Sequence, residues 1–261
     1  MELERIQSYD RAMALSRRSL GRGLLRNGFP TPEDCRRAAE AGALRCLERE
    51  DGFLLVLRRP QGFDRLYFAV APGAEPFAFD APLPVLAELP RRAGEADAAG
   101  AYLARCGFTR QFERVRVARP GRLPLPAAPE LAVRQAENGE LETVCGFLEG
   151  FYDRFTGCLP TPEELAEEYC CLIPGPEGPR GVLHARVERS FGEMRHFALV
   201  PALRGTGAAE ALLAAFLRGL GEKPCRLWVA DDNARALGFY QKCGFHTEAL
   251  RSAVWRKETT K

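Results

Sequence analysis

Apolar residues in the second half of the chain recur in short runs or alternate with polar residues, and both patterns are typical of β-strands. Glycine, proline or charged residues bound each of these stretches. The predicted strands cover residues 131–136 ("LAVRQA"), 181–188 ("GVLHARVE"), 194–200 ("MRHFALV") and 225–230 ("CRLWVA"), with a closing strand after Gly244.

Other stretches show the longer period of a helix, with apolar residues three or four positions apart. Ala208–Leu220 carries the clearest apolar stripe, and Gly221 follows it as a stop signal. Helices are also predicted over Asn138–Phe151 and Thr161–Cys171, and another follows the Asp-Asn pair at 232–233, whose side chains suit an N-cap. The alternation of strands and helices predicts an α/β fold with a central sheet.

Three short stretches of the first half recur in the second half in the same order, at offsets of 130, 129 and 137 residues. Such self-similarity indicates two diverged copies of one domain. The pairs are "PTPED" (Pro30–Asp34) with "PTPEE" (Pro160–Glu164), "YFAVAP" (Tyr67–Pro72) with "HFALVP" (His196–Pro201), and "CGF" at Cys106–Phe108 and again at Cys243–Phe245.

A proline-rich stretch, "ARPGRLPLPAAPE" at Ala118–Glu130, separates the two copies. Proline lacks the amide hydrogen that a sheet or helix interior needs, so this stretch is expected to be a semi-stiff connector. The expected domains are therefore residues 1–119 and 131–261, joined by a linker at 120–130.

Composition limits the partners of the chain. Lysine and arginine number 37 against 35 acidic residues, which gives no strong field for nucleic acid or an anionic membrane. No apolar run approaches the roughly 20 residues of a membrane-spanning helix, and the first residues, "MELERIQSYD", are charged where a signal peptide would be apolar. We therefore expect a cytoplasmic protein without membrane or nucleic-acid partners.

The nine cysteines contain no Cys-x-x-Cys pair, so neither a disulfide framework nor a metal site is expected.

The candidate chemistry begins with Arg-Gly-Thr-Gly at residues 204–207, between a predicted strand and the Ala208–Leu220 helix. Glycines expose backbone amides, the start of a helix carries partial positive charge, and an arginine suits phosphate oxygens, so this loop is a candidate phosphate site. A dinucleotide loop is disfavoured because Glu210 replaces its last glycine, and no Gly-Lys-Ser/Thr triplet of a Walker loop is present. A plain tight turn before a core helix remains the alternative.

Two motifs together resemble the GNAT superfamily of N-acetyltransferases. Arg204-x-x-Gly207-x-Ala209 after "LVP" is similar to the acyl-CoA loop of that family. Downstream, "NARALGFYQKCGF" resembles the family's second segment, with the expected spacings at Asn233, Ala236, Tyr240, Gly244 and Phe245. The resemblance implies two tandem GNAT-like domains, each a mixed central sheet flanked by helices.

By this resemblance the cosubstrate is acetyl-CoA. Leu199 and Val200 would offer backbone groups to the pantetheine arm, and Asn233 would contact that arm, although it also suits a plain helix cap. Tyr240 lies two helical turns beyond Asn233 and would hydrogen-bond the departing sulfur; a core tyrosine is the alternative. The pyrophosphate would be held by Arg204, Gly205, Thr206, Gly207, Ala208 and Ala209.

A protonated amine needs a proton acceptor, either directly or through water. Glu193 lies six residues before Leu199, where some members of the family carry a glutamate base, and an even spacing along a strand would place both on one face. A glutamate in the turn "SFGEMR" is the competing interpretation. His184 and His196 are further options.

The first copy does not retain these motifs. At the offset of 129 residues, the loop positions fall on Glu75, Pro76, Ala78 and Asp80, which offer acids and a proline where a pyrophosphate needs positive charge and free amides. This copy is expected to be a degenerate scaffold that packs as an internal pseudo-dimer, and the chain is expected to be a monomer.

The expected function is transfer of an acetyl group from acetyl-CoA to a primary amine of a small molecule or a protein. A non-catalytic acyl-CoA-binding module, acting as a sensor or regulator, is the alternative. The acceptor is open: its surroundings are expected within Glu149–Cys171, where aromatic and acidic residues would suit a cationic amine or form an ordinary solvated helix face. These residues are Phe151, Tyr152, Asp153, Phe155, Glu163, Glu164, Glu167 and Glu168.

Overall fold

The fold is known from a computed structural model, which describes residues 3–259. It is a mixed α/β structure, as predicted, and its contacts divide it into two compact units. Unit 1 contains the residues up to Arg114 together with those from Leu250 onwards, and unit 2 contains Val115–Ala249. No helix in the described part of the chain is long and apolar enough to cross a bilayer.

Unit 1 is built on a mixed sheet with the strand order β1-β3-β4-β5-β6-β13, and β2 also pairs with β5. The strands β1 to β5 are antiparallel neighbours, whereas β5 and β6 run parallel. The strands are β1 (Glu4–Arg5), β2 (Leu25–Arg26), β3 (Leu44–Arg49), β4 (Gly52–Arg59), β5 (Phe63–Val70), β6 (Val85–Arg92) and the part of β13 (His246–Lys257) from Leu250.

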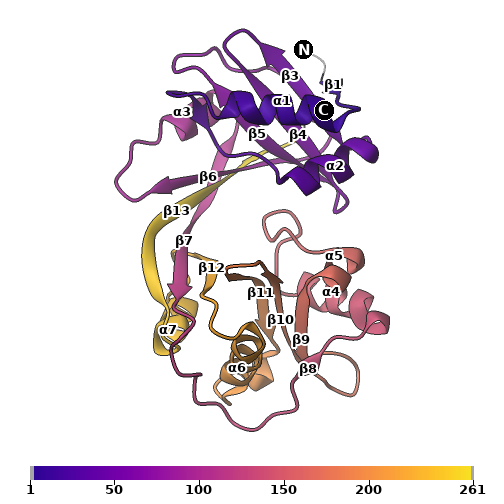
Figure 1. The fold of residues 1–261 in the computed structure, drawn as a ribbon, viewed down its shortest axis with the longest axis vertical. Coiled ribbons are helices and arrows are strands. Elements are labelled where there is room, and N and C mark those ends of the chain that lie inside the picture. The colour runs from indigo at the N-terminus through magenta and orange to yellow at the C-terminus, as the bar shows by residue number, and fades with distance from the viewer. Residues whose placement is uncertain (1–2, 260–261) are drawn as a thin grey trace. The chain divides into compact units, whose positions relative to one another are not determined.

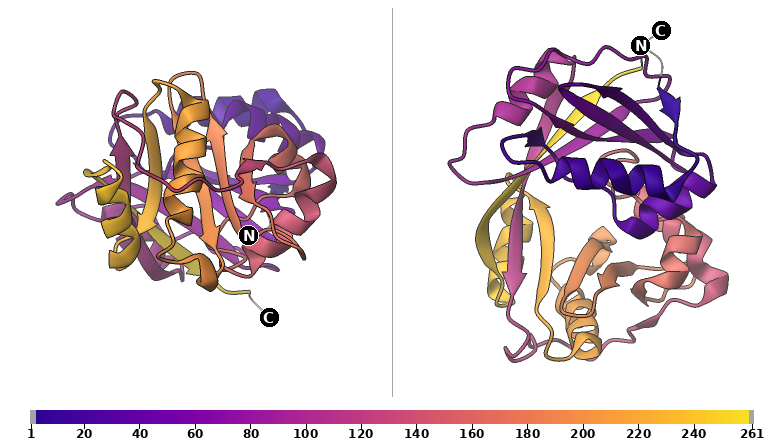
Figure 2. Two further views of the ribbon diagram at one scale, coloured as in Figure 1. Left: turned by 90° about the horizontal axis from the view of Figure 1, so that it is seen from below. Right: turned by 45° about the horizontal axis from the view of Figure 1, so that its top comes forward.

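Helices cover both faces of this sheet. α1 (Tyr9–Ser19) and α2 (Pro32–Glu40) pack over one face, in a cluster of buried side chains with β3 and β4 (Figure 2). α3 (Ala98–Arg105) contributes Tyr102 and Leu103 to a separate cluster on the other face.

Unit 2 repeats this plan with the strand order β7-β12-β11-β10-β9-β8. β11 and β12 run parallel, and β8 to β11 are antiparallel neighbours. The strands are β7 (Thr109–Arg119, from Val115), β8 (Arg134–Gln135), β9 (Tyr169–Ile173), β10 (Gly181–Val187), β11 (Gly192–Leu199) and β12 (Cys225–Ala230).

The helices of unit 2 also divide between two faces (Figure 1). α6 (Ala208–Leu220) and α7 (Ala234–Lys242) share one core with Met194 and Leu227 of the sheet. α4 (Leu141–Glu149), which follows the 3₁₀ turn Asn138–Glu140, and α5 (Pro162–Glu167) pack on the opposite face against residues such as Val182 and Ala198.

Two local predictions differ from the structure. The helix predicted over Thr161–Cys171 ends at Glu167, because Tyr169–Ile173 form β9 and pair with β10. The run of apolar residues there fits a buried strand as well as a helix, and only the pairing with β10 decides between them. The strand predicted over 131–136 is limited to Arg134–Gln135.

The repeated sequence stretches lie at equivalent points of the two units. Thr31 and Thr161 each cap the helix that follows, α2 or α5. In each "CGF" the glycine has a positive φ, 83° at Gly107 and 85° at Gly244, and the next amide bonds back into the preceding helix. These two repeats are therefore helix-start and helix-stop signals, for which few residue types are suitable, whereas "YFAVAP" and "HFALVP" lie at the ends of β5 and β11.

At the C-terminal end of the chain, the compact units differ from the expected domain ranges, because the residues from Leu250 onwards belong to unit 1. Within β13, the residues from Leu250 to Lys257 pair with β6 of unit 1. The sequence alone would assign this strand to the second copy, because it is the last element predicted for that copy.

Arg119 fixes the start of the proline-rich stretch. Its guanidinium is buried and donates to the backbone carbonyls of Cys243, Pro120, Leu123 and Pro124. We expect Arg119→Lys to lower the free energy of unfolding by about 1.5 kcal/mol, because an ammonium group keeps the charge but cannot reach four carbonyls in one plane. Urea unfolding measures the change, and Arg122→Lys, at an exposed position, is the matched control. Equal stabilities of the two variants would contradict the assigned role.

Candidate active site

The strands β11 and β12 separate along their length. Their parallel pairing extends from Gly192↔Cys225 to Met194↔Leu227, yet β11 continues to Leu199 and β12 to Ala230. Antiparallel pairing with β10 directs alternate backbone groups of β11 to one side. Because Val200 donates to the carbonyl of Arg180 on that side, the N–H and C=O of Phe197 and Leu199 point to the other side, where β11 and β12 diverge.

A cavity of about 520 Å³ opens at this divergence. Its lining combines aromatic walls with four charged or amide side chains from the glycine loop and the starts of α6 and α7, and with both glycines of the Arg-Gly-Thr-Gly loop. The lining residues are Phe151, Tyr152, Phe197, Ala198, Leu199, Leu203, Arg204, Gly205, Gly207, Ala209, Glu210, Asn233, Arg235, Ala236, Phe239 and Tyr240.

The glycine loop presents free backbone amides at the start of α6. Gly205 and Gly207 have φ values of 78° and 84°, a left-handed conformation that favours glycine. Gly207 is the N-cap and has no side chain to accept a hydrogen bond, and the first bond within the helix is donated by Ala211. The earlier amides therefore have no capping acceptor in the described part of the chain, which is the arrangement that binds phosphate groups.

Most of the residues expected to hold a cosubstrate lie at this cavity. Leu199, Arg204, Gly205, Gly207, Ala209 and Asn233 all line it. Thr206 and Ala208 are not in the lining, and the Thr206 hydroxyl donates to the carbonyl of Leu203. The side chain of Asn233 accepts from the amide of Ala236, so its role as a helix cap is present.

The expectation for Val200 is corrected. Its N–H donates to the carbonyl of Arg180, its C=O accepts from the amide of Leu203, and it does not line the cavity. Its backbone groups are thus already used. Arg235, one residue beyond the start of α7, lines the cavity instead and adds a second cation. Its position two residues after Asn233, in "NARA", was the sequence feature that could have indicated this role.

Tyr240 lines the cavity with its side chain 6% exposed. Its ring packs edge-on against Phe239 and Phe245. No hydrogen-bond partner of the hydroxyl is found among residues 3–259. Burial, with a further contribution from Tyr152, raises the pKa of Tyr240 well above its usual value near 10, so the hydroxyl keeps its proton.

Tyr152 bridges the open edge of β11. Its hydroxyl donates to the carbonyl of Phe197 over 3.0 Å and accepts from the amide of Phe197 over 2.8 Å. Tyr152 belongs to the segment expected near the acceptor, but no local pattern could indicate its contact with Phe197, 45 positions away in the chain.

The geometric basis for Glu193 as a base is wrong. A β-bulge opposite the His184/Ala185 step shifts the register, so Met194 and Leu199 both face the core under α6 and the even spacing of Glu193 and Leu199 no longer puts them on one face. Glu193 pairs with Arg226 over 3.3 Å and is absent from the cavity lining. Its catalytic role stays a prediction without geometric support.

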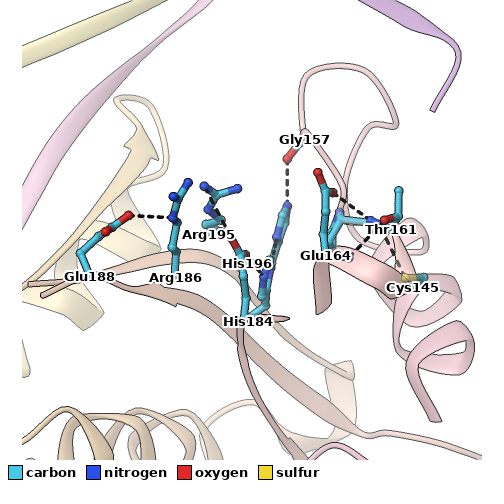
Figure 3. A network of polar contacts seen from close by, with 11 residues as sticks. Cys145, Gly157, Thr161, Glu164, His184, Arg186, Glu188, Arg195 and His196 are labelled. Atoms are coloured by element: carbon cyan, nitrogen blue, oxygen red, sulfur yellow. Dashed lines mark hydrogen bonds and ion pairs between the residues drawn. The ribbon is translucent and has the colours of Figure 1, made fainter. Parts of the chain in front are cut away.

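The other two candidate bases, His184 and His196, are buried together on the α4/α5 face of the sheet (Figure 3). Neither lines the cavity. Both nitrogens of each ring contact other groups of the chain, which leaves no free nitrogen to accept a proton from an amine.

In unit 1 the position equivalent to the cavity, between β5 and β6, is filled by β2 and the side chain of Asn27. β5 and β6 pair only at Asp64↔Val85 and Arg65↔Leu86 before they diverge. Beyond that point β2 pairs with β5, and the amide side chain of Asn27 donates to the carbonyl of Leu66 and accepts from the amide of Phe68. The edge that stays open in unit 2 is thus filled in unit 1.

Comparisons agree with this architecture. Residues 131–245 match the model of the acetyltransferase (GNAT) family. A tandem GNAT protein from the clavulanic acid biosynthesis pathway superposes with a TM-score of 0.61 and 15% identity, over 97% of this chain and 95% of that chain. No curated protein matches the sequence.

Two further solved structures show the same fold. The GCN5-related N-acetyltransferase from Sphaerobacter thermophilus superposes with a TM-score of 0.55 and 17% identity, covering 87% of this chain and 85% of its own. The corresponding protein from Kribbella flavida gives a TM-score of 0.55 and 18% identity, over 83% of this chain and 90% of its own.

Proposed function

Residues 131–245 form a domain of the acetyltransferase (GNAT) family, and we propose that it transfers an acetyl group from acetyl-CoA to a primary amine. The observation that carries the proposal is the cavity between β11 and β12, which brings free helix-start amides and the unpartnered hydroxyl of Tyr240 to one space. Two tandem domains, of which the second is active, fit the filled edge of β5 in unit 1.

The chemistry of the lining fits a long anionic thioester. The amides at the start of α6, together with Arg204 and Arg235, would hold its diphosphate. The N–H and C=O of Leu199 would pair with the amides of the pantetheine arm, in the way that an added strand pairs with a sheet edge. When bound, acetyl-CoA supplies an acetyl group activated as a thioester.

Tyr240 acts on the departing sulfur as a hydrogen-bond donor. The raised pKa keeps the proton on oxygen at neutral pH. It also makes full transfer of that proton to a thiolate, with a pKa near 8.5, more costly than for an ordinary tyrosine. The stabilisation is therefore expected from a hydrogen bond that strengthens as charge develops on sulfur.

The acceptor amine enters on the side of Phe151 and Tyr152, where the segment between α4 and α5 borders the cavity. The acceptor is a primary amine of a small molecule or of a protein. Glu210 is the single carboxylate in the lining and lies in the first turn of α6, beside the glycine loop. The amine proton is therefore expected to leave to water, with most of the rate supplied by holding amine and thioester together.

Titration calorimetry with acetyl-CoA tests the proposal. We expect one site per chain, and Arg204→Glu is expected to weaken binding at least tenfold because a carboxylate would face the diphosphate. Arg189→Glu, an exposed charge reversal outside the cavity, is the control. Two sites would show that unit 1 also binds, and binding without acetylation of any amine in a broad panel would favour a regulatory acyl-CoA-binding module.

A further inference from the structure

Three ionisable side chains, those of Glu168, His184 and His196, form a row of contacts. Figure 3 shows the two histidines beneath Gly157, which lies in the segment that joins α4 to α5. The Nε2 of His184 lies 2.6 Å from a carboxylate oxygen of Glu168, and its Nδ1 lies 3.0 Å from the Nδ1 of His196. The Nε2 of His196 lies 2.9 Å from the carbonyl oxygen of Gly157. Both histidines are at most 2% exposed, so water does not replace these contacts.

The three contacts require three hydrogens. An ionised carboxylate and a backbone carbonyl can only accept, so both Nε2 atoms must carry a proton. The contact between the two Nδ1 atoms needs a third proton on one of them. Two neutral imidazoles carry only two ring N–H protons in total. With only these two protons, one of the three contacts would place two lone pairs opposite each other at hydrogen-bonding distance.

We propose that the row formed by Glu168, His184 and His196 stores one extra proton and thereby clamps the segment that carries Tyr152 to the sheet. The extra proton makes His184 an imidazolium that donates to Glu168 and to His196. His196 is neutral and donates to the carbonyl of Gly157. Neither histidine is a catalytic residue; both are positioning residues.

The charges around the row favour this arrangement. Burial and the neighbouring His184 lower the pKa of His196 to about 3, so His196 is the neutral ring. Although burial opposes it, the contacts with His184 and with Arg195, 3.9 Å away, keep the pKa of Glu168 below its usual value. The carboxylate is therefore ionised and accepts from His184.

The remaining ionisable groups near the row do not compete for the proton. Arg186 on β10 and Arg195 on β11 are cations that act on Glu168. Burial raises the pKa of Cys170, which pairs with His184 across β9 and β10, to about 12. Burial also raises the pKa of Tyr152. Both groups stay neutral.

The row reaches the cavity through Gly157 and Tyr152. A Cβ on Gly157 would lie 2.6 Å from the carbonyl oxygen of Asp153 and 2.9 Å from the Cβ of Tyr152, so the chain is closely packed there. The ring of His196 also packs edge-on against Tyr152, at 5.1 Å between centroids. The hydroxyl of Tyr152 in turn bridges Phe197 at the open edge of β11.

The clamp holds while the row keeps its extra proton and is released when that proton is lost. Loss of the extra proton leaves two hydrogens for three contacts, and one contact becomes repulsive. A fall in pH does not release the clamp until His196 or Glu168 takes up a proton, and the pKa of each is lowered. The consequence for acetyl transfer rests on the proposed function, whereas the proton count does not.

Glu168→Gln tests whether the three contacts can be kept without the extra proton. A glutamine amide can donate to the Nε2 of His184, whose Nδ1–H then donates to His196, so two neutral rings satisfy all three contacts. This variant is expected to keep the segment clamped at alkaline pH. Glu168→Ala removes the partner of His184 and is expected to loosen the segment at every pH. Glu167→Gln, at an exposed neighbouring position, matches the change in charge.

Two measurements on the full chain without acetyl-CoA give the result. Nitrogen NMR of the histidine rings, which needs no variant, is expected to find three ring protons shared by His184 and His196 at neutral pH. Hydrogen exchange of the amides of Phe155, Thr156 and Gly157, corrected for the intrinsic pH dependence, is expected to quicken roughly tenfold at alkaline pH in the natural chain and in Glu167→Gln, but not in Glu168→Gln.

Two neutral rings beside an ionised Glu168, or the same alkaline loosening in Glu168→Gln as in the natural chain, would overturn the proposal. A protonated Glu168 beside two neutral rings would support the stored proton and move its location from His184 to the carboxyl group. All these outcomes are independent of acetyl transfer, so they remain decisive if the proposed reaction fails.

Discussion

Replacing Tyr240 by phenylalanine is expected to lower kcat about 100-fold, while the affinity for acetyl-CoA changes by less than about threefold. The hydroxyl has no partner within the described residues that it would stabilise in the free protein, and Tyr240 lines the cavity. Its interaction is therefore made mainly with the departing sulfur, and its loss should affect kcat and kcat/KM equally. Steady-state kinetics and calorimetry measure the two quantities once an accepted amine has been found.

The melting temperature shows whether the Tyr240→Phe variant is still folded. Phenylalanine fills the same volume between Phe239 and Phe245, so the melting temperature should not fall. Tyr169→Phe removes a hydroxyl from a partly buried ring that packs on Phe216 outside the cavity, and it should leave kcat unchanged. A Tyr240→Phe enzyme with full kcat would refute the assignment of the donor and leave Tyr240 as a core residue.

Replacing Gly207 by alanine is expected to cost roughly 2 to 4 kcal/mol of folding free energy and to weaken acetyl-CoA binding at least tenfold. Two independent reasons add at this position. The φ of 84° is unfavourable for alanine, and a Cβ there would lie 2.6 Å from the Cδ of Pro129 in the proline-rich stretch. The loop would have to move, and with it the free amides at the start of α6.

Gly205→Ala separates these two reasons. Gly205 has a similar φ of 78°, but a Cβ there meets no atom within 4 Å. It should therefore show only the backbone cost, about 1 kcal/mol. Urea unfolding and calorimetry with acetyl-CoA compare the pair. Equal losses in both variants would mean that Pro129 yields without cost and that the proline-rich stretch does not restrain the loop.

The features that the sequence predicted correctly are those with local causes. The helix Ala208–Leu220 and the strand Cys225–Ala230 have the predicted bounds. The apolar stripe that ends at Gly221 is compatible only with a helix, and the short apolar run is compatible only with a strand. The glycine loop and the Asn233 cap belong to the same class, since positive φ values and helix caps admit few residue types.

Errors arose where contacts distant in sequence decide the outcome. The residues after Glu167 form a strand because β10 lies beside them, and the bulge in β10 and β11 changes the side to which Glu193 points. Strand pairing depends on register across the sheet, and a shift of one residue reverses every side chain. A sequence pattern read within one strand contains no information about such a shift.

The sequence by itself determined that the second half carries a phosphate-binding loop, a tyrosine two turns beyond a helix cap and the motifs of an acetyltransferase, because spacing along one helix or loop fixes their relative positions. The tertiary structure alone decided that β11 and β12 diverge into a cavity, that β2 and Asn27 fill the equivalent edge in unit 1, and that Glu168, His184 and His196 meet under the Tyr152 segment. These arrangements join residues that are distant in sequence, such as Phe151 and Tyr240 at the cavity, and their approach depends on the packing of the whole sheet.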